Sequence, residues 1–285
     1  MKPSSVPWLL PAVLLLLSTR LEAAPAPAAD GLDHPDCPKH LQLPARPSGS
    51  PVDDIRGLRP GASLDTAILY LECLDPQARY RQRTAFNSDI LLPNRKRYYE
   101  GQVRTRVWLQ AVPPYTSIGD EPVAKVDFQL VSFGEPGRET VFFIDQTQSF
   151  DQATQPTVRT VLNSLQKKYG TPSFIVNGDW QPFSASTLDS ESHPQLLQLG
   201  WAWDGAGQPT AQRASSQDAD FSCEGPGVSP CVLAIHATLN GDGIMVTSLT
   251  VSIRRVAAHA AAVRDADARW AAAEVEKAKD RKPAL

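Results

Sequence analysis

The sequence predicts an α+β fold in which helices and runs of antiparallel strands are segregated along the chain. Apolar residues recur at helical spacing over residues 64–71 and 158–169, and they alternate with polar residues in the segments that follow each of these. The 285 residues are 42% hydrophobic and 21% charged, which excludes a fully disordered chain and a collagen-like fibre.

Residues 1–23 are expected to be a signal peptide. Lys2 provides a basic start, and Trp8–Leu17 is an apolar run of about ten residues, whereas a spanning helix needs roughly 20. A short membrane anchor is the alternative interpretation. No later stretch is long and apolar enough to span a bilayer, so the mature protein is expected to be periplasmic or secreted. Residues 24–52 are rich in Pro and predict an irregular arm.

Export to an oxidising compartment predicts that the four cysteines form two disulfides. Cys223 and Cys231 flank a Gly- and Pro-containing loop that can bring them together, which leaves Cys37 to pair with Cys73. The spacing of His34, Cys37 and His40 could also suit a metal, but a fourth ligand is not evident and the cysteine is expected to be oxidised. We therefore expect a disulfide-tethered arm and no metal or cofactor.

Residues 53–150 predict a first helix-plus-sheet unit. A helix is expected to begin after Gly61, with Ser63 as its N-cap and Leu64 on its core-facing stripe. Cys73 lies on the opposite side of this helix from Leu64, which favours a bridge to the arm. Alternating patterns then predict strands around residues 80–86, 103–110, 126–130 and 141–144.

Residues 151–255 predict a second unit of the same order. A helix over residues 157–169 is expected to end at Gly170. Strands are expected at residues 173–176, 199–203, 232–239 and 246–254, and Trp201 and Trp203 are expected to fill the core. Residues 256–285 predict a C-terminal helix. The order is therefore helix and four strands, used twice, with a boundary near residue 150.

The segment from Gly57 to Leu64 (GLRPGASL) resembles a helix-start pattern, G-[IL]-x-x-G-M-[ST], that many exported bacterial proteins carry. Small outer-membrane-assembly lipoproteins, modules similar to secreted β-lactamase-inhibitor proteins and uncharacterised proteobacterial exported proteins share it. Residues 156–172 (PTVRTVLNSLQKKYGTP) look like the second helix of the last group. The resemblance implies an envelope-facing, non-catalytic α+β module, and it transfers no functional residue.

The sequence contains none of the common catalytic signatures. It has no nucleophile elbow, no Gly-rich dinucleotide or phosphate loop, and no zinc-protease motif. His236 alternates with Ala234 and Thr238 on a predicted strand, opposite an apolar face, so it is expected to be a solvent-facing histidine. We therefore expect no enzymatic activity.

A basic patch is the clearest functional signal. Residues 79–106 contain eight basic and two acidic residues. In extended strands Arg79, Arg81 and Arg83 share one face, and Arg104 and Arg106 are expected to share a face with Trp108. The alternative is an ordinary solvated strand face.

These observations predict an exported, non-enzymatic interaction protein of the bacterial envelope. Its basic sheet face would bind an envelope protein or another anionic envelope component. Nucleic acid is not expected, because the chain is exported and lacks a recognised binding motif. Two alternatives remain open, an exported hydrolase with a site built from distant residues and a purely structural envelope component.

Overall fold

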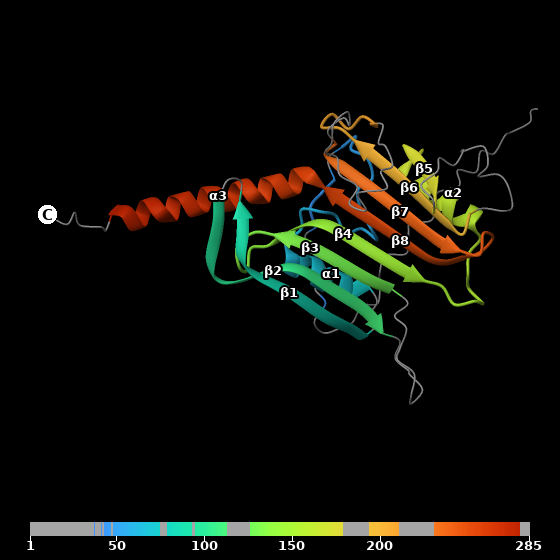
Figure 1. Ribbon diagram of the computed structural model, residues 1–285, viewed down its shortest axis with the longest axis horizontal. Helices are drawn as coiled ribbons and strands as arrows, with labels where there is room; N and C mark the ends of the chain where they lie inside the picture. Colours follow the sequence, from blue (N-terminus) through green and yellow to red (C-terminus); the bar gives the residue numbers. More distant parts are fainter. Residues whose placement is uncertain are drawn as a thin grey trace, which may run out of the picture. The chain divides into compact units, whose positions relative to one another are not determined.

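The computed structural model describes residues 37, 41, 43–46, 48–74, 79–92, 95–112, 126–178, 194–210 and 231–279 (Figure 1). The predicted signal peptide, His34, His40, His193 and Cys223 lie outside the described residues. The elements follow in the order α1 (Leu64–Leu74), β1 (Arg79–Leu92), β2 (Arg95–Val112), β3 (Val126–Phe133), β4 (Thr140–Ser149), α2 (Val158–Tyr169), β5 (Phe174–Asn177), β6 (Leu196–Trp203), β7 (Leu233–Gly241), β8 (Val246–Arg255) and α3 (Val256–Lys279).

The strands of the described residues form one antiparallel sheet, in the order β1-β2-β3-β4-β8-β7-β6-β5. The α+β class is thus confirmed, but the expectation of two separate helix-plus-sheet units is not met. β4 pairs with β8 from Phe143 opposite Arg254 to Ser149 opposite Ser248, which joins the two four-stranded halves into a single sheet. The pairing has a simple cause, because each of these strands would otherwise present an unpaired edge to solvent.

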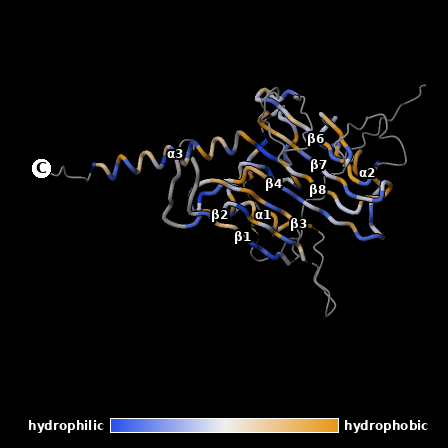
Figure 2. Tube along the Cα trace, in the orientation of Figure 1, coloured by the Kyte–Doolittle hydropathy of each residue, from blue (hydrophilic) through white to orange (hydrophobic). Residues whose placement is uncertain are grey.

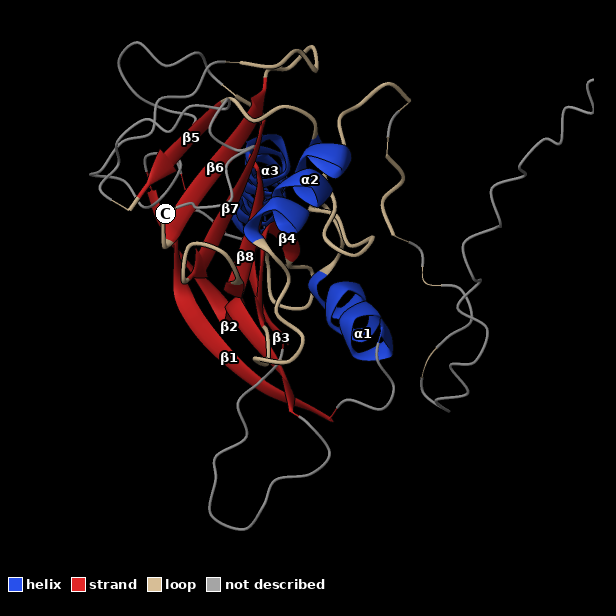
Figure 3. Cartoon of the chain, turned by 90° about the vertical axis from the view of Figure 1, so that its right-hand side faces the viewer, coloured by secondary structure: helices blue, strands red, loops and turns tan. Residues whose placement is uncertain are grey.

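Helices α1 and α2 pack on the same face of the sheet (Figure 3). The Ser63 hydroxyl accepts a hydrogen bond from the backbone N–H of Thr66 at 3.2 Å, which confirms the predicted cap of α1. Thr157 caps α2 in the same way, and Gly170 ends that helix with a φ of 85°. That left-handed conformation is one that glycine adopts without steric cost.

The main core lies between these two helices and the sheet. The apolar stripes of both helices are buried there, as are the inward-facing residues of the strands. Trp201 is 1% exposed and Trp203 is 7% exposed, so the prediction that both fill the core is confirmed. In Figure 2 apolar and polar residues alternate along the central strands, as expected for a sheet whose two faces differ.

The opposite face of the sheet, called here the open face, is covered at one end by α3. Val263 and Ala266 of α3 pack against Val103 of β2 and Phe133 of β3. His259 stacks on the ring of Phe142, with 4.3 Å between ring centroids. Among the described residues, no helix is both long enough and apolar enough to cross a membrane.

A disulfide joins Cys37 of the N-terminal arm to Cys73 of α1, with 5.8 Å between the Cα atoms. This pairing was predicted and is confirmed. Cys231 is also disulfide-bonded, and its predicted partner Cys223 lies outside the described residues. The tether holds the arm against the helix that begins the fold.

A buried carboxylate connects the segment before α1 to the end of β8. Asp53 is 2% exposed and accepts hydrogen bonds from Arg59 at 2.7 Å and from Arg255 at 3.2 Å. Arg59 is itself 4% exposed and donates a further hydrogen bond to the carbonyl oxygen of Pro44. Because a buried charge is tolerated only when it is paired, each member of this cluster depends on the others.

Asp53→Asn is expected to lower the free energy of unfolding by about 3 kcal/mol, because it leaves the buried Arg59 without its counter-charge. The control Asp265→Asn changes an exposed residue of α3 and should shift stability by less than about 0.5 kcal/mol. Urea unfolding at neutral pH measures both. Equal stabilities for the two variants would contradict the role given to Asp53.

Non-reducing peptide mapping is expected to recover a peptide that links Cys223 to Cys231, beside the one that links Cys37 to Cys73. The short loop between the first two residues makes their closure favourable by about 2–3 kcal/mol on the chain-entropy model. A peptide that joins Cys231 to the N-terminal arm would contradict the predicted pairing.

Candidate functional site

A β-bulge in β2 separates two arginines that were expected to share a face. Ala85 of β1 pairs with Arg106, and the next residue of β1, Phe86, pairs with Arg104, so Thr105 is an extra residue in β2. One extra residue reverses which side chains face which side of a strand. The expectation that Arg104 and Arg106 share a face is therefore wrong.

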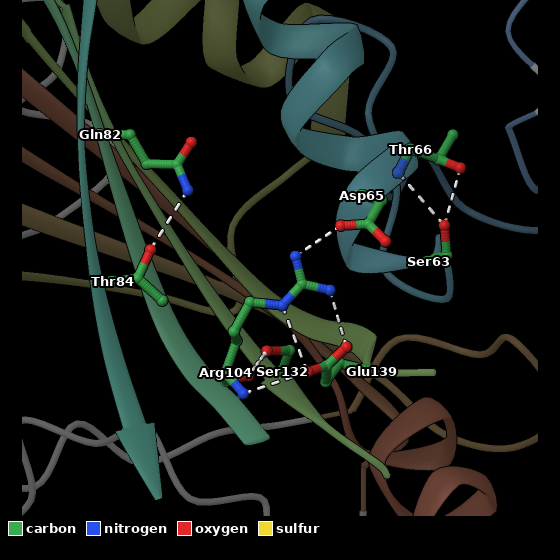
Figure 4. A network of polar contacts seen from close by, with 8 residues as sticks. All are labelled: Ser63, Asp65, Thr66, Gln82, Thr84, Arg104, Ser132 and Glu139. Atoms are coloured by element: carbon green, nitrogen blue, oxygen red, sulfur yellow. Dashed lines mark hydrogen bonds and ion pairs between the residues drawn. The ribbon is translucent and has the colours of Figure 1, made fainter. Parts of the chain in front are cut away.

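Arg104 points toward α1 and forms a structural ion-pair cluster (Figure 4). It contacts Glu139 at 2.8 Å, where the carboxylate is 1% exposed, and it also contacts Asp65 of α1. Burial alone would raise the pKa of Glu139, but the hydrogen bonds and charge of Arg104 outweigh it and lower that pKa. The same hydrogen bonds raise the pKa of Arg104. This arginine joins α1 to the sheet and does not belong to the open face.

The open face instead carries an Arg–Trp strip, which consists of Arg81, Arg83, Arg106 and Trp108. The guanidinium carbon of Arg83 lies 4.7 Å from the centroid of the Trp108 ring, and that of Arg106 lies 5.7 Å from it. The indole N–H of Trp108 donates to the side-chain oxygen of Gln129 at 3.1 Å, which fixes the ring. All three arginines are exposed. The backbone of Arg79 pairs with Val112, and its side chain is outside the described part.

Beside the strip, one line of cross-strand neighbours runs over the open face. Trp108 of β2 lies opposite Gln129 of β3, which in turn lies opposite Asp145 of β4. Ser252 of β8 lies opposite both Asp145 and His236 of β7, and its hydroxyl donates to the Asp145 carboxylate at 3.2 Å. Side chains of directly opposite residues lie on the same face of a sheet and within contact distance.

This line borders a cavity of about 360 Å³ on the open face. Its polar lining consists of Arg106, Gln129, Asp145, His236, Ser252 and Arg254, and its apolar lining consists of Val131, Phe142, Phe143 and Ala234. A cavity of this size and mixed lining is typical of a small-molecule site.

Two titratable groups in the cavity have strongly shifted pKa values. Burial raises the pKa of Asp145 to about 6, a shift that the hydrogen bond from Ser252 only partly offsets. Burial lowers the pKa of His236 to about 3, so its imidazole is neutral at physiological pH. The prediction that His236 lies on the face away from the apolar residues is correct, but the expectation that it faces solvent is wrong. Its side chain is half-buried in the cavity wall.

The hydrolase alternative required a histidine near a serine and a carboxylate in one cleft, and Asp145, Ser252 and His236 do line one cavity. Their order differs from that of a catalytic triad, in which the histidine stands between nucleophile and carboxylate. Here the serine hydroxyl donates directly to Asp145. β8 is also paired on both sides, so its backbone N–H groups are used by the sheet and do not form an oxyanion hole. This geometry favours binding over acyl transfer.

The metal alternative receives no support from the described residues. Cys37 is oxidised in its disulfide, and His34 and His40 lie outside the described part. Among the described residues, no group of three or more His, Cys, Asp or Glu side chains is placed to hold a metal ion.

The sequence pointed to Trp108, Arg81, Arg83 and Arg106, whose use in binding stays a prediction, but it did not indicate the cavity beside them. Asp145, Ser252 and Arg254 come together only because β4 pairs with β8, and these strands are about 100 residues apart in the chain. No local pattern signals such a pairing. The one available sign was a polar residue at every second position of β8, which fitted a solvated face equally well.

Asp145→Asn is expected to raise the free energy of unfolding at pH 7.5 by about 1–2 kcal/mol, because the neutral amide avoids burial of a charge and its oxygen can still accept the bond from Ser252. The folded pKa of about 6 lies above the unfolded value of 3.8, so the folded state binds more protons between these limits. The advantage of the variant should therefore shrink as the pH falls from 6 and vanish below about 3.8.

Urea unfolding at pH 7.5 and at pH 4 measures this difference. The pH dependence due to His236 is common to both proteins and cancels in the comparison. Asp265→Asn, at an exposed site, should match the parent protein at both pH values. A variant that is less stable than the parent at pH 7.5 would show that charged Asp145 stabilises the fold.

The chain was compared with protein families, curated proteins and solved structures. No protein-family model matches the chain, and searches of curated proteins and of solved structures found no match.

Proposed function

We propose that the protein is an exported, non-enzymatic binding protein of the bacterial envelope, and that the Arg–Trp strip binds an acidic surface of a partner protein. The observation that carries the proposal is that the guanidinium groups of Arg83 and Arg106 both lie over one fixed tryptophan ring. Tryptophan and arginine are the residue types that dominate binding energy in protein interfaces.

Within the described residues no hydrogen bond or ion pair uses the guanidinium N–H groups of Arg83 or Arg106, so these groups are available. Cation–π contact uses the flat face of a guanidinium, whereas a carboxylate binds along its N–H edge in a bidentate manner. Gln129 fixes Trp108, and the ring in turn fixes the arginines. These side chains are therefore already ordered in the free protein. They lose less conformational entropy on binding, which favours affinity.

The charges of the strip are not neutralised within the described part of the chain. No described carboxylate forms an ion pair with Arg81, Arg83 or Arg106. The described acidic residues on the open face are Asp127 and Asp145, and burial raises the pKa of both. Since pre-ordered guanidinium edges bind planar carboxylates in a bidentate manner, this geometry suits Glu and Asp side chains.

The disulfide between Cys37 and Cys73 supports the proposal that the protein is exported. Structural disulfides persist in oxidising compartments and are rare in the cytosol. The absence of an acyl-transfer geometry in the cavity supports the non-enzymatic assignment.

Binding of fluorescently labelled poly-L-glutamate, followed by anisotropy, tests the strip. Arg81→Glu/Arg83→Glu is expected to weaken binding about tenfold or more, or about 1.4 kcal/mol, because it replaces two attractive charges with repulsive ones. Arg138→Glu/Arg264→Glu is the matched control, since it reverses two exposed arginines outside the strip and changes the net charge equally.

Equal weakening by the strip variant and the control would mean that only net charge matters, and it would overturn the proposal. Heparin and vesicles that contain phosphatidylglycerol serve as competing polyanions. Tighter binding of either one than of poly-L-glutamate, with the same dependence on Arg81 and Arg83, would reassign the strip to a glycan or a lipid surface.

A further inference from the structure

We propose that the cavity on the open face is a binding site for a small organic carboxylate with an apolar body, held between Arg106 and Arg254. The site lies beside the Arg–Trp strip but is distinct from it, because Arg254 and most of the cavity lining do not belong to the strip. The inference is independent of the proposed function.

A second line of cross-strand neighbours contributes four of the residues that line the cavity. Arg106 of β2 lies opposite Val131, Val131 lies opposite Phe143, and Phe143 lies opposite Arg254 of β8. Neighbouring strands are about 4.8 Å apart, so the Cα atoms of the two arginines are separated by about 14 Å with apolar side chains between them. This pairing places the two arginines on either side of Val131 and Phe143, so both side chains border one apolar surface.

Both arginines are available to an anion. Within the described residues neither Arg106 nor Arg254 is in an ion pair, although Asp145 lines the same cavity. Burial raises the pKa of Asp145 and only the hydrogen bond from Ser252 opposes this rise, so neither guanidinium group contributes to it. Arg254 is partly buried, and a guanidinium of this kind that lines a cavity without a carboxylate partner is the group that an incoming anion would satisfy.

The remaining polar side chains can orient such a ligand. Gln129, Ser252 and His236 supply an amide, a hydroxyl and a neutral imidazole, all of which can form hydrogen bonds without adding charge. Sites of this kind use an apolar body to gain affinity and a few polar groups to fix orientation. A monocarboxylate matches the two cations better than a neutral or cationic molecule of the same shape.

The charge of Asp145 should modulate the affinity. The charged and titratable groups that face it or wall the cavity are Arg106 of β2, His236 of β7 and Arg254 of β8, with His259 of α3 behind Phe142. The pKa of Asp145 is about 6, so this carboxyl titrates in that range, whereas His236, with a pKa of about 3, remains neutral. Protonation of Asp145 removes a negative charge next to the bound carboxylate and should tighten binding at pH 5.5 relative to pH 7.5.

Isothermal titration calorimetry with 3-phenylpropionate, 3-phenylpropanol and 3-phenylpropylammonium tests the site. The three probes share one apolar body and differ in charge. We expect the carboxylate to bind about tenfold more tightly than the alcohol, and the ammonium probe not to bind measurably. Arg254→Gln should weaken the binding of 3-phenylpropionate about tenfold. Arg106→Gln removes the other cation and is the second variant if Arg254→Gln does not fold.

Arg81→Glu/Arg83→Glu is the discriminating control, because it should weaken poly-L-glutamate binding about tenfold or more but leave 3-phenylpropionate affinity within about twofold. Asp145→Asn should abolish the gain in affinity at pH 5.5. Equal binding of the acid and the alcohol, no binding of the acid, or an unchanged affinity in the folded Arg254→Gln variant would each overturn the site. These outcomes leave the poly-L-glutamate result untouched, so the two proposals can fail separately.

Discussion

The pairing of β4 with β8 is the contact on which the rest of the structure depends. It joins two four-stranded halves through seven consecutive residue pairs and places both helices α1 and α2 over one continuous sheet. It also sets the register that brings Asp145 opposite Ser252 and, through β7, beside His236. A slip of one residue would turn these side chains into the core and bring Ile144 and Ile253 to the surface. The register of a hydrophobic sheet therefore determines the chemistry of its other face.

Much of the fold could be predicted from the sequence, because helical and alternating periodicities are local. The bounds of α1 and α2, the Ser63 cap and the Cys37–Cys73 disulfide follow from such patterns together with export. What failed were features that depend on distant contacts. The single sheet needs two strands about 100 residues apart, and the bulge at Thr105 reverses a face without any Gly or Pro to signal it. His236 was placed on the correct face, yet its burial depends on neighbouring strands.

Arg104 and Arg106 show how one inserted residue divides similar side chains between two roles. Arg104 is directed to the helices, where Glu139 and Asp65 hold it in an ion-pair cluster. Arg106 is directed to the open face, where its partner is the ring of Trp108. Arg104 stabilises the packing of α1 on the sheet, and its removal would leave the buried carboxylate of Glu139 unpaired. Arg106 remains available to bind an external anion. Net charge over a stretch of sequence cannot distinguish these cases.

The position of β1 at the end of the sheet has a further consequence. An edge strand offers its free N–H and C=O groups to any other extended chain, including the same edge of a second molecule. Two copies of β1 aligned antiparallel would bring Arg81 and Arg83 of one molecule against the same residues of the other. The resulting repulsion disfavours edge-to-edge polymerisation, and salt would weaken this protection by screening it. In this alignment the arginines of β1 would oppose self-association most strongly at low ionic strength.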